Sequence, residues 1–379
     1  MRDERPRLDR VLDAAFGDDE PSRLGSGWIS GVTGVFLGAL AVCGVMAFRF
    51  PSVFTTEQFR AAYPVPALRA VLQAAIGLAF LCGCASLWLR RRKVLGLTAC
   101  ILALAAGLAG GGSVPVGDVR NGSWSLGLDW FALNLLLTAL VFVPLERLFP
   151  RLPGQGAFRR GWTTDGLHFL VSHVLVEMVS FLILLPSVTA ATLVQPAALQ
   201  ALVRVQPGWL QFLEVVLLAD VAQYAVHRSF HRVPLLWRFH SVHHSSRDLD
   251  WLAGSRLHVV DVVATRGLVL LPLSLLGFAE AALYAYLVFV SFHAVFIHAN
   301  VRFRLRALER LLVTPRFHHW HHASADEARD RNFAVHLPWL DRLFGTAYLP
   351  EGAWPSAYGI AGDPVPEGYV AQLVHPLRG

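Results

Sequence analysis

The chain has 379 residues, of which 54% are hydrophobic and only 16% are charged. Its mean hydropathy is positive, a balance that is typical of proteins with several membrane spans and excludes an ordinary soluble domain. The formal net charge is +6, but the basic residues form no stripe with stacking aromatic side chains, so we expect no nucleic-acid partner. All four cysteines fall inside apolar segments, which favours packing roles over disulfides or zinc ligation.

Apolar segments of helical length recur along the chain. A helix that crosses the hydrocarbon core of a bilayer needs about 20 residues. We count about eight such segments, the last two of which could instead form a short re-entrant hairpin: 28–48, 66–89, 94–111, 126–145, 167–185, 209–226, 259–278 and 279–297. The sequence therefore predicts an all-α, polytopic integral membrane bundle of about eight spans.

Basic residues mark alternate ends of these segments. Clusters follow the second, fourth and sixth segments, at 90–93, 147–160 and 228–238. By the positive-inside rule, these ends and the N-terminus face the cytoplasm. The chain has one lysine against 32 arginines, a bias of GC-rich bacterial genomes, so we expect a bacterial inner membrane.

Composition divides the chain into four parts. Residues 1–25 are charged and indicate a polar cytoplasmic tail, and residues 26–150 hold four spans without convergent ionisable groups. After a linker rich in Pro, Gly and Arg, residues 162–350 carry every histidine box and form the candidate catalytic domain. Residues 351–379 contain Pro and Gly at short intervals, which predicts an irregular C-terminal tail.

Three histidine clusters carry the chemistry of this domain. They are HxxxH at 227–231, HxxHH at 240–244 and HxxHH at 318–322. Residues three and four apart share a face of a helix, so each box directs two or three imidazoles to one point. Eight convergent histidines exceed what one metal ion uses and suit two adjacent ions. A helix that directs the third box inward turns the extra histidine, His319, away, so we leave it out of the ligand set.

Other polar residues lie close to the boxes. Asp220 is two helical turns before His227 on the same face, and we expect its carboxylate to hold a ligand imidazole in the right tautomer. His258 follows the second box, and His298 closes an apolar span; both are candidate ligands. His293 lies elsewhere around the same helix, so we expect it to be a hydrogen-bonded residue of the span.

Imidazole ligands alone suit iron, copper, nickel or zinc. The position of the site favours one of them, because a dimetal site at the cytosolic membrane face, beneath spans that could guide an acyl or isoprenoid chain, indicates chemistry on an unactivated C–H bond. Such chemistry needs a redox metal and O2, which favours two iron ions, with zinc as a possible replacement in isolated protein. The sequence has no flavin, haem or iron–sulfur motif, so electrons must come from an external ferredoxin- or cytochrome-type protein. The arginines at 228–238 either dock this partner or anchor lipid headgroups.

About half of the chain, roughly 162–348, resembles the fatty acid hydroxylase/sterol desaturase superfamily of membrane di-iron oxygenases. The similar segments are 220–231, 236–245, 256–258, 298–302, 314–322, 332–333 and 341–346. The sequence departs from the family pattern Arg-x-His-Pro-x-Glu, because Val259 and Asp261 replace the Pro and the Glu. The resemblance implies a helical membrane bundle with a cytosolic helical cap that holds the two irons.

The resemblance also implies a set of metal ligands. Nine histidines are implied to bind the metals: His227, His231, His240, His243, His244, His298, His318, His321 and His322. We add His258 as a tenth candidate ligand, and Asp220 and Asn332 as candidate catalytic residues.

The expected function is O2-dependent hydroxylation or desaturation of a C–H bond in a membrane lipid, such as a sterol, fatty acyl chain, alkylglycerol or carotenoid. Two other functions compete with it. A non-catalytic metal-binding or transport protein would place polar ligands along its spans, whereas these histidines gather at one surface. A lipid-binding relative without chemistry would not need three intact boxes.

Overall fold

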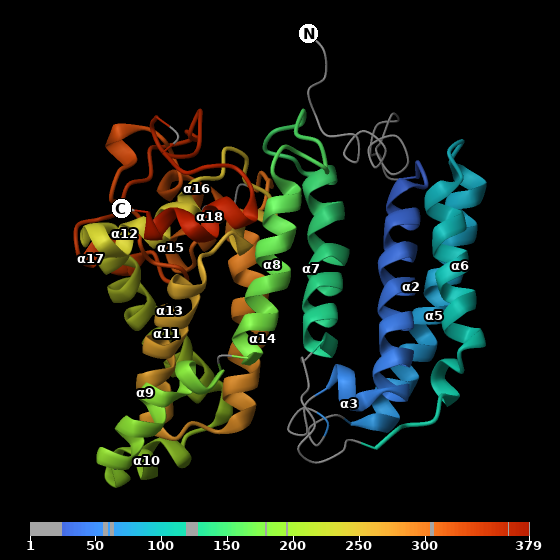
Figure 1. Cartoon of the computed structure of the whole chain (residues 1–379), viewed down its shortest axis with the longest axis horizontal. Coiled ribbons are helices and arrows are strands. Elements are labelled where there is room, and N and C mark those ends of the chain that lie inside the picture. The colour runs from blue at the N-terminus through green and yellow to red at the C-terminus, as the bar shows by residue number, and fades with distance from the viewer. Residues whose placement is uncertain are drawn as a thin grey trace. The chain divides into compact units, whose positions relative to one another are not determined.

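The computed structural model describes residues 25–55, 60, 64–118, 128–178, 180–194, 196–303, 307–362 and 364–378. The chain divides into two compact units, Met1–Arg160 and Gly161–Gly379. Within the described residues every regular element is a helix, and an isolated antiparallel bridge joins Ala323 to Tyr358. The expectation of an all-α protein is confirmed (Figure 1).

The first unit is built from long apolar helices. They are α2 (Trp28–Arg49), α5 (Val65–Leu89), α6 (Val94–Leu108) and α7 (Leu128–Leu148), with the short α3 (Pro51–Phe54) and η1 (Gly111–Ser113) between them. Glycines allow α2, α5 and α6 to approach closely, because a Cβ at Gly31 would lie 2.5 Å from the Ser86 hydroxyl and one at Gly83 would lie 2.7 Å from the Cys100 sulfur. Small residues serve the same purpose wherever helices pack in a bilayer.

The second unit combines long helices with a compact cap. The long helices include α11 (Gly208–Arg232), α13 (Val259–Leu276) and α14 (Glu280–His298), accompanied by α8 (Trp162–Met178), α9 (Ser180–Leu193) and the short α10 (Ala197–Arg204). The cap lies at the end where α11 and α14 finish, opposite α10 (Figure 1). It contains α12 (Pro234–His244), η2 (Ala253–Ser255), α15 (Leu308–Leu311), α16 (Pro315–His321), η3 (Asp326–Ala328), α17 (Trp339–Leu343), α18 (Tyr369–Val374) and η4 (His375–Leu377).

Seven helices in the described part of the chain are long and apolar enough to cross a membrane: α2, α5, the segment Val94–Ser113, α7, α11, α13 and α14. The predicted span at 167–185 is divided between α8 and α9, so the count of eight is not confirmed. The last two predicted spans are separate helices, because α13 ends at Gly277 with φ 64°, the left-handed conformation that favours glycine after a helix.

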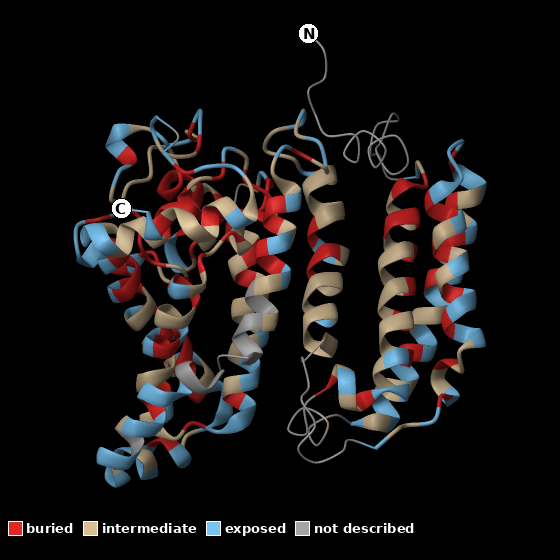
Figure 2. Cartoon of the chain, in the orientation of Figure 1, coloured by how far each residue is buried: buried red, intermediate tan, exposed pale blue. Residues whose placement is uncertain are grey.

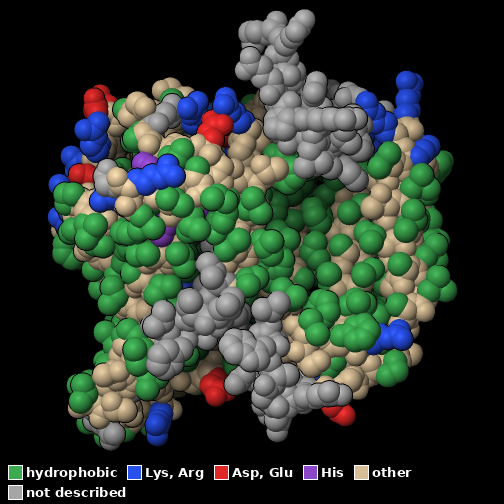
Figure 3. All heavy atoms as spheres, viewed as in Figure 1, with side chains coloured by type: hydrophobic (Ala, Val, Ile, Leu, Met, Phe, Trp, Pro, Cys, Tyr) green, Lys and Arg blue, Asp and Glu red, His purple; other side chains and the backbone are tan. Residues whose placement is uncertain are grey.

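Burial is concentrated in the cap of the second unit, as Figure 2 shows. Hydrophobic side chains cover the sides of the long helices below it, and Arg side chains gather over the cap (Figure 3). Beneath the histidine boxes lies an apolar cluster that includes Tyr224, Ile297, Phe317 and Phe333. The C-terminal segment, expected to be an irregular tail, contains α18 and η4 and buries Gln372 to 2% exposure, so it belongs to the cap.

Candidate metal centre

Four helices present the boxes to one another. His227 and His231 lie in the last two turns of α11, and the second box closes α12. His298 is the last residue of α14, and the third box spans α16 and the residue after it. Both α12 and α16 carry Pro in the first turn, where its fixed φ and missing N–H suit a helix start. A proline therefore marks the start of each of the two short helices that carry the second and third boxes.

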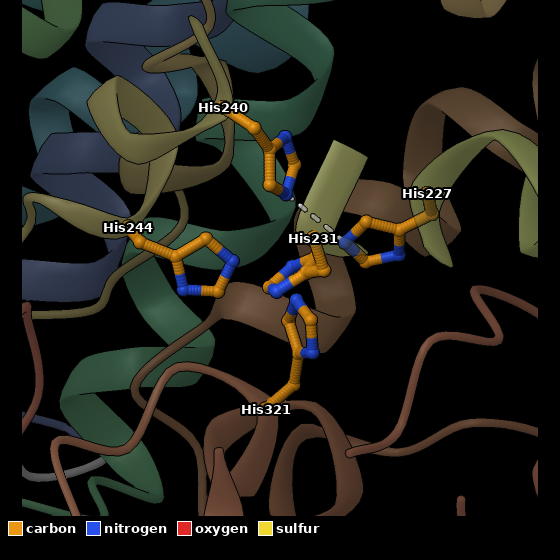
Figure 4. Close-up of side chains that lie close together, drawn as sticks. All are labelled: His227, His231, His240, His244 and His321. Carbon is orange, nitrogen blue, oxygen red and sulfur yellow. Dashed lines mark hydrogen bonds between the residues drawn. The ribbon is translucent and has the colours of Figure 1, made fainter. Parts of the chain in front are cut away.

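The nine histidines form two groups whose ligand atoms all lie within 4.8 Å of one another in each group. The five-histidine group contains His227, His231, His240, His244 and His321, and Figure 4 shows their rings converging on a common space. The four-histidine group contains His243, His298, His318 and His322. Both groups combine residues from helices far apart in the sequence, so the fold completes each of them.

The spacing of ring nitrogens within the groups matches metal coordination. The Nε2 atoms of His227 and His240 are 3.1 Å apart, and His298 Nε2 lies 3.0 Å from His318 Nε2 and 3.4 Å from His243 Nε2. Metal–imidazole bonds of about 2.0–2.1 Å place two ligand nitrogens about 3.0 Å apart at a right angle and about 3.4 Å apart at the tetrahedral angle. Within each group, these nitrogens are therefore spaced as ligands of a single metal ion would be.

Several of these nitrogens are buried without a partner. Among the described residues, the Nε2 atoms of His231, His244 and His321 are inaccessible to water and make no hydrogen bond. Leaving a buried polar atom unpaired costs about 1–3 kcal/mol. Three such atoms pointing to one space fit a bound cation that accepts their lone pairs, so the residues present suit a metal ion.

Backbone carbonyls fix the opposite nitrogen of four rings. The Nδ1–H groups donate to carbonyl oxygens over 2.7 Å from His227 to Phe333, 2.8 Å from His321 to Arg331, 3.1 Å from His243 to Arg256 and 2.7 Å from His298 to Ala294. A proton held on Nδ1 leaves the Nε2 lone pair free for a metal. Every residue has a backbone carbonyl, so the sequence alone could not predict which carbonyls bind these rings.

Carboxylates support two rings of the five-histidine group. His240 Nδ1 lies 2.6 Å from Asp261 Oδ2, and Thr265 donates to the other oxygen of Asp261 over 3.1 Å. His231 Nδ1 lies 3.6 Å from Asp330 Oδ1. Asp261 occupies a position where the sequence departs from the family pattern, and its short acidic side chain reaches His240 from the first turn of α13. Sequence reasoning missed this pair.

Asp220 has a different contact from the one expected. Its carboxylate accepts the backbone N–H groups of residues 335, 336 and 337 at 3.0, 3.0 and 2.6 Å, and the ring of His227 is held by Phe333 instead. Asp220 therefore fixes the loop that follows Phe333, and it acts on the ligands through that loop.

The structure does not bring His258 to either group. His258 is the N-cap of α13, where its Nδ1 accepts the N–H of Val260 over 3.1 Å and its Nε2–H donates to the Leu373 carbonyl over 3.1 Å. Both ring nitrogens are thus occupied.

Asn332 shapes the loop between the third box and α17. Its φ is 59°, a left-handed conformation that Asn tolerates better than most residues. Its side chain donates to the carbonyls of Phe317 and Tyr348 and accepts the N–H of Tyr348, all within 2.9 Å. The next residue, Phe333, carries the carbonyl that orients His227, so Asn332 is a positioning residue here.

Two further histidines lie near the boxes but outside both groups. His319 accepts from the Tyr358 hydroxyl over 2.8 Å and donates to the His298 carbonyl over 3.2 Å. His293 lies 3.0 Å from His336, ring nitrogen to ring nitrogen, and donates to the Val313 carbonyl. Gly254 leaves room for the ring of His298, because a Cβ at this position would lie 2.7 Å from His298 Nδ1.

Burial sets the protonation state of the cap ligands. It lowers the pKa of His243, His244, His318, His321 and His322 well below the usual value, and neighbouring histidines act in the same direction. The imidazoles are therefore neutral at neutral pH, which is the form that binds a metal.

Fold and site together define a class: an all-helical membrane protein in which nine histidines, eight of them buried, form two adjoining groups that could each hold a metal ion. The comparisons with known proteins identify the family. Residues 212–346 match the family model described as fatty acid hydroxylase. The ornithine lipid hydroxylase OlsE of Rhizobium tropici is 31% identical over 255 residues, which cover 66% of this chain and 76% of that protein. The chain therefore belongs to the fatty acid hydroxylase/sterol desaturase superfamily.

Alkylglycerol monooxygenases match over a shorter stretch. The human protein is 34% identical over 128 residues, or 34% of this chain and 28% of that protein, and the Danio rerio protein is 33% identical over 143 residues, or 38% and 30%. The chain thus spans less than a third of the length of these two relatives. No solved structure matches the chain.

Proposed function

We propose that the protein is a membrane oxidoreductase that hydroxylates a C–H bond of a polar lipid with O2 and two iron ions. The observation that carries the proposal is the pair of histidine groups, because the ligand atoms converge in both of them and three buried Nε2 atoms of the five-histidine group have no hydrogen-bond partner. The named activities of the relatives support it, since one hydroxylates ornithine lipid and others oxidise alkylglycerols. These names favour hydroxylation over desaturation.

The residues divide the work between binding and positioning. The nine imidazoles would hold the metal pair, and in five of them a backbone carbonyl or Asp261 would keep the proton on Nδ1. Bound iron would supply the activation of O2 that an alkyl C–H bond requires. The cap excludes water, because eight of the nine ligands are buried, and this protects a reactive centre from side reactions.

The overall reaction converts R–H, O2, two electrons and two protons into R–OH and water. Its electrons would come from a ferredoxin- or cytochrome-type protein. We place the cap on the cytoplasmic side of a bacterial inner membrane, because the basic clusters lie at that end of the spans. The ligands all lie within 162–350, which we propose as the catalytic domain, with 26–150 as an accessory membrane module.

A non-catalytic metal-binding or transport protein remains the competing function. It would need ligands along a path through the spans, whereas both groups lie in the cap and at the ends of α11 and α14.

Comparative lipidomics of a deletion strain tests the proposal. A lipid that carries one more oxygen in the parent strain than in the deletion strain is the expected result, with the difference restored by the intact gene. Purified protein should contain about two metal ions and consume O2 with that lipid and a reduced donor. Metal binding without any lipid change or O2 consumption would instead indicate the non-catalytic function.

A further inference from the structure

A surface of the cap formed by α15 and α17 exposes large apolar side chains. Leu311 and Leu343 are each 67% exposed, Phe344 is 50% exposed and Trp339 is 39% exposed. Trp339 and Leu343 are four residues apart and share one face of α17. The side chain of Arg342 donates to the carbonyls of residues 309 and 310, so the two short helices lie side by side. We call these four apolar residues the cap patch.

The cap patch lies beside a membrane-spanning helix. The ring of Phe344 stacks on that of Tyr224, with centroids 5.0 Å apart and an interplanar angle of 23°, and Thr346 is 2.9 Å from the Tyr224 hydroxyl. Tyr224 lies eight residues, or about 12 Å, before the end of α11. Phe344 and Thr346 therefore pack against the last third of a helix that is long and apolar enough to cross a membrane.

The charges around the cap patch are sorted by sign. Arg310 and Arg342 are exposed. The acidic residues turn inward, where Glu309 accepts two bonds from Arg316 and Asp341 accepts the N–H groups of residues 333 and 334. The outer surface therefore combines apolar side chains with positive charge.

We infer that the cap patch is a membrane-contact surface, which inserts into one leaflet while Arg310 and Arg342 bind the phosphates of anionic headgroups. Trp, Leu and Phe beside arginines are the side chains that partition to this boundary, and basic residues near an anionic membrane surface strengthen the contact. Continuity with α11 favours lipid over a protein partner. The membrane contact would hold α17 in place. Its residue Asp341 accepts the N–H of Phe333, whose carbonyl orients His227.

Photo-crosslinking of the full-length protein in bilayer nanodiscs tests this inference. Leu343 is replaced by p-benzoylphenylalanine, and the nanodiscs contain equal amounts of phosphatidylcholine and phosphatidylglycerol. Glu327, an exposed residue of the polar helix η3, takes the same replacement as a control. We expect at least about tenfold more lipid adduct at 343, because only a side chain in the leaflet meets acyl C–H bonds. Adducts to a second copy of the chain, or lipid adducts no more abundant than at 327, would overturn the inference.

The composition of the adducts tests the arginines. Phosphatidylglycerol should be enriched over its bulk share at 343, and Arg310→Gln should reduce that enrichment, while Arg204→Gln on α10, at the opposite end of the unit, should not. If phosphatidylglycerol made up only its bulk share of the adducts at 343 in protein that keeps Arg310, the headgroup contact would be contradicted. Neither readout requires turnover, so failure of the proposed hydroxylase activity would leave both results interpretable.

Discussion

Replacing Asp261 with Asn should weaken one metal position and spare the other. The bond from His240 to Asp261 measures 2.6 Å, and both side chains are 5% exposed. Losing the charge from a buried, charge-assisted bond costs about 1.5–3 kcal/mol. Since about 1.4 kcal/mol corresponds to a tenfold change, the Kd at the five-histidine group should rise about 10- to 100-fold, in line with the effect of other partners that orient metal-bound histidine.

The assay is competition with a graded chelator, using protein loaded with cobalt as a spectroscopic probe. The parent protein should retain about two ions at a chelator concentration where Asp261→Asn retains about one. Asp326→Asn, an 85% exposed residue on η3, serves as the matched control and should behave as the parent. Unchanged retention in Asp261→Asn, or equal loss from both positions, would refute the reasoning that this carboxylate acts through His240 alone.

Three other changes have defined outcomes. His243→Ala should lower metal content and abolish turnover, while His319→Ala should keep the metal stoichiometry, because His319 belongs to neither group and its ring contacts Tyr358 and the His298 carbonyl. Metal analysis of both variants tests this difference. Asn332→Ala should lower the melting temperature more than Asn332→Gly, because both variants lose the side-chain hydrogen bonds but only Gly accepts the positive φ without strain. The reverse order would contradict the role of the left-handed conformation at this position. The metal-free protein should lose stability as the pH falls through about 6.5. Burial lowers the pKa of the cap histidines, so the unfolded chain binds more protons than the folded chain, and a melting temperature independent of pH from about 7.5 to 5.5 would contradict this.

The box spacing predicted which histidines converge, but it could not divide them between two groups. His243 and His244 are adjacent in sequence, yet they belong to different groups. Adjacent residues on a helix point about 100° apart. The group that each ring joins therefore depends on which other helices pack against its side of α12, and these helices are distant in sequence. The third box divides in the same way, since His321 joins α11 residues while His318 joins His298.

The supporting residues were harder to predict, because their partners are distant in sequence. Periodicity placed Asp220 on the face of His227, but the groups it binds are the amides of residues 335–337. His258 stands in a motif beside the boxes, and its role as an N-cap follows from the backbone at the start of α13. Asp261 looked like a departure from the family pattern until the fold brought it to His240.

The loop from residue 331 to 337 shows how this chain places carbonyls where its ligands need them. Asp341 takes the N–H groups of residues 333 and 334, and Asp220 takes those of residues 335 to 337. Asn332 holds the loop in a left-handed turn. With its amides bound on one side, the loop presents the carbonyls of Arg331 and Phe333 to two ligand imidazoles. Buried carboxylates that never touch the metal ligands thus determine their tautomers, because a backbone whose N–H groups are fixed has little freedom left in the direction of its C=O groups.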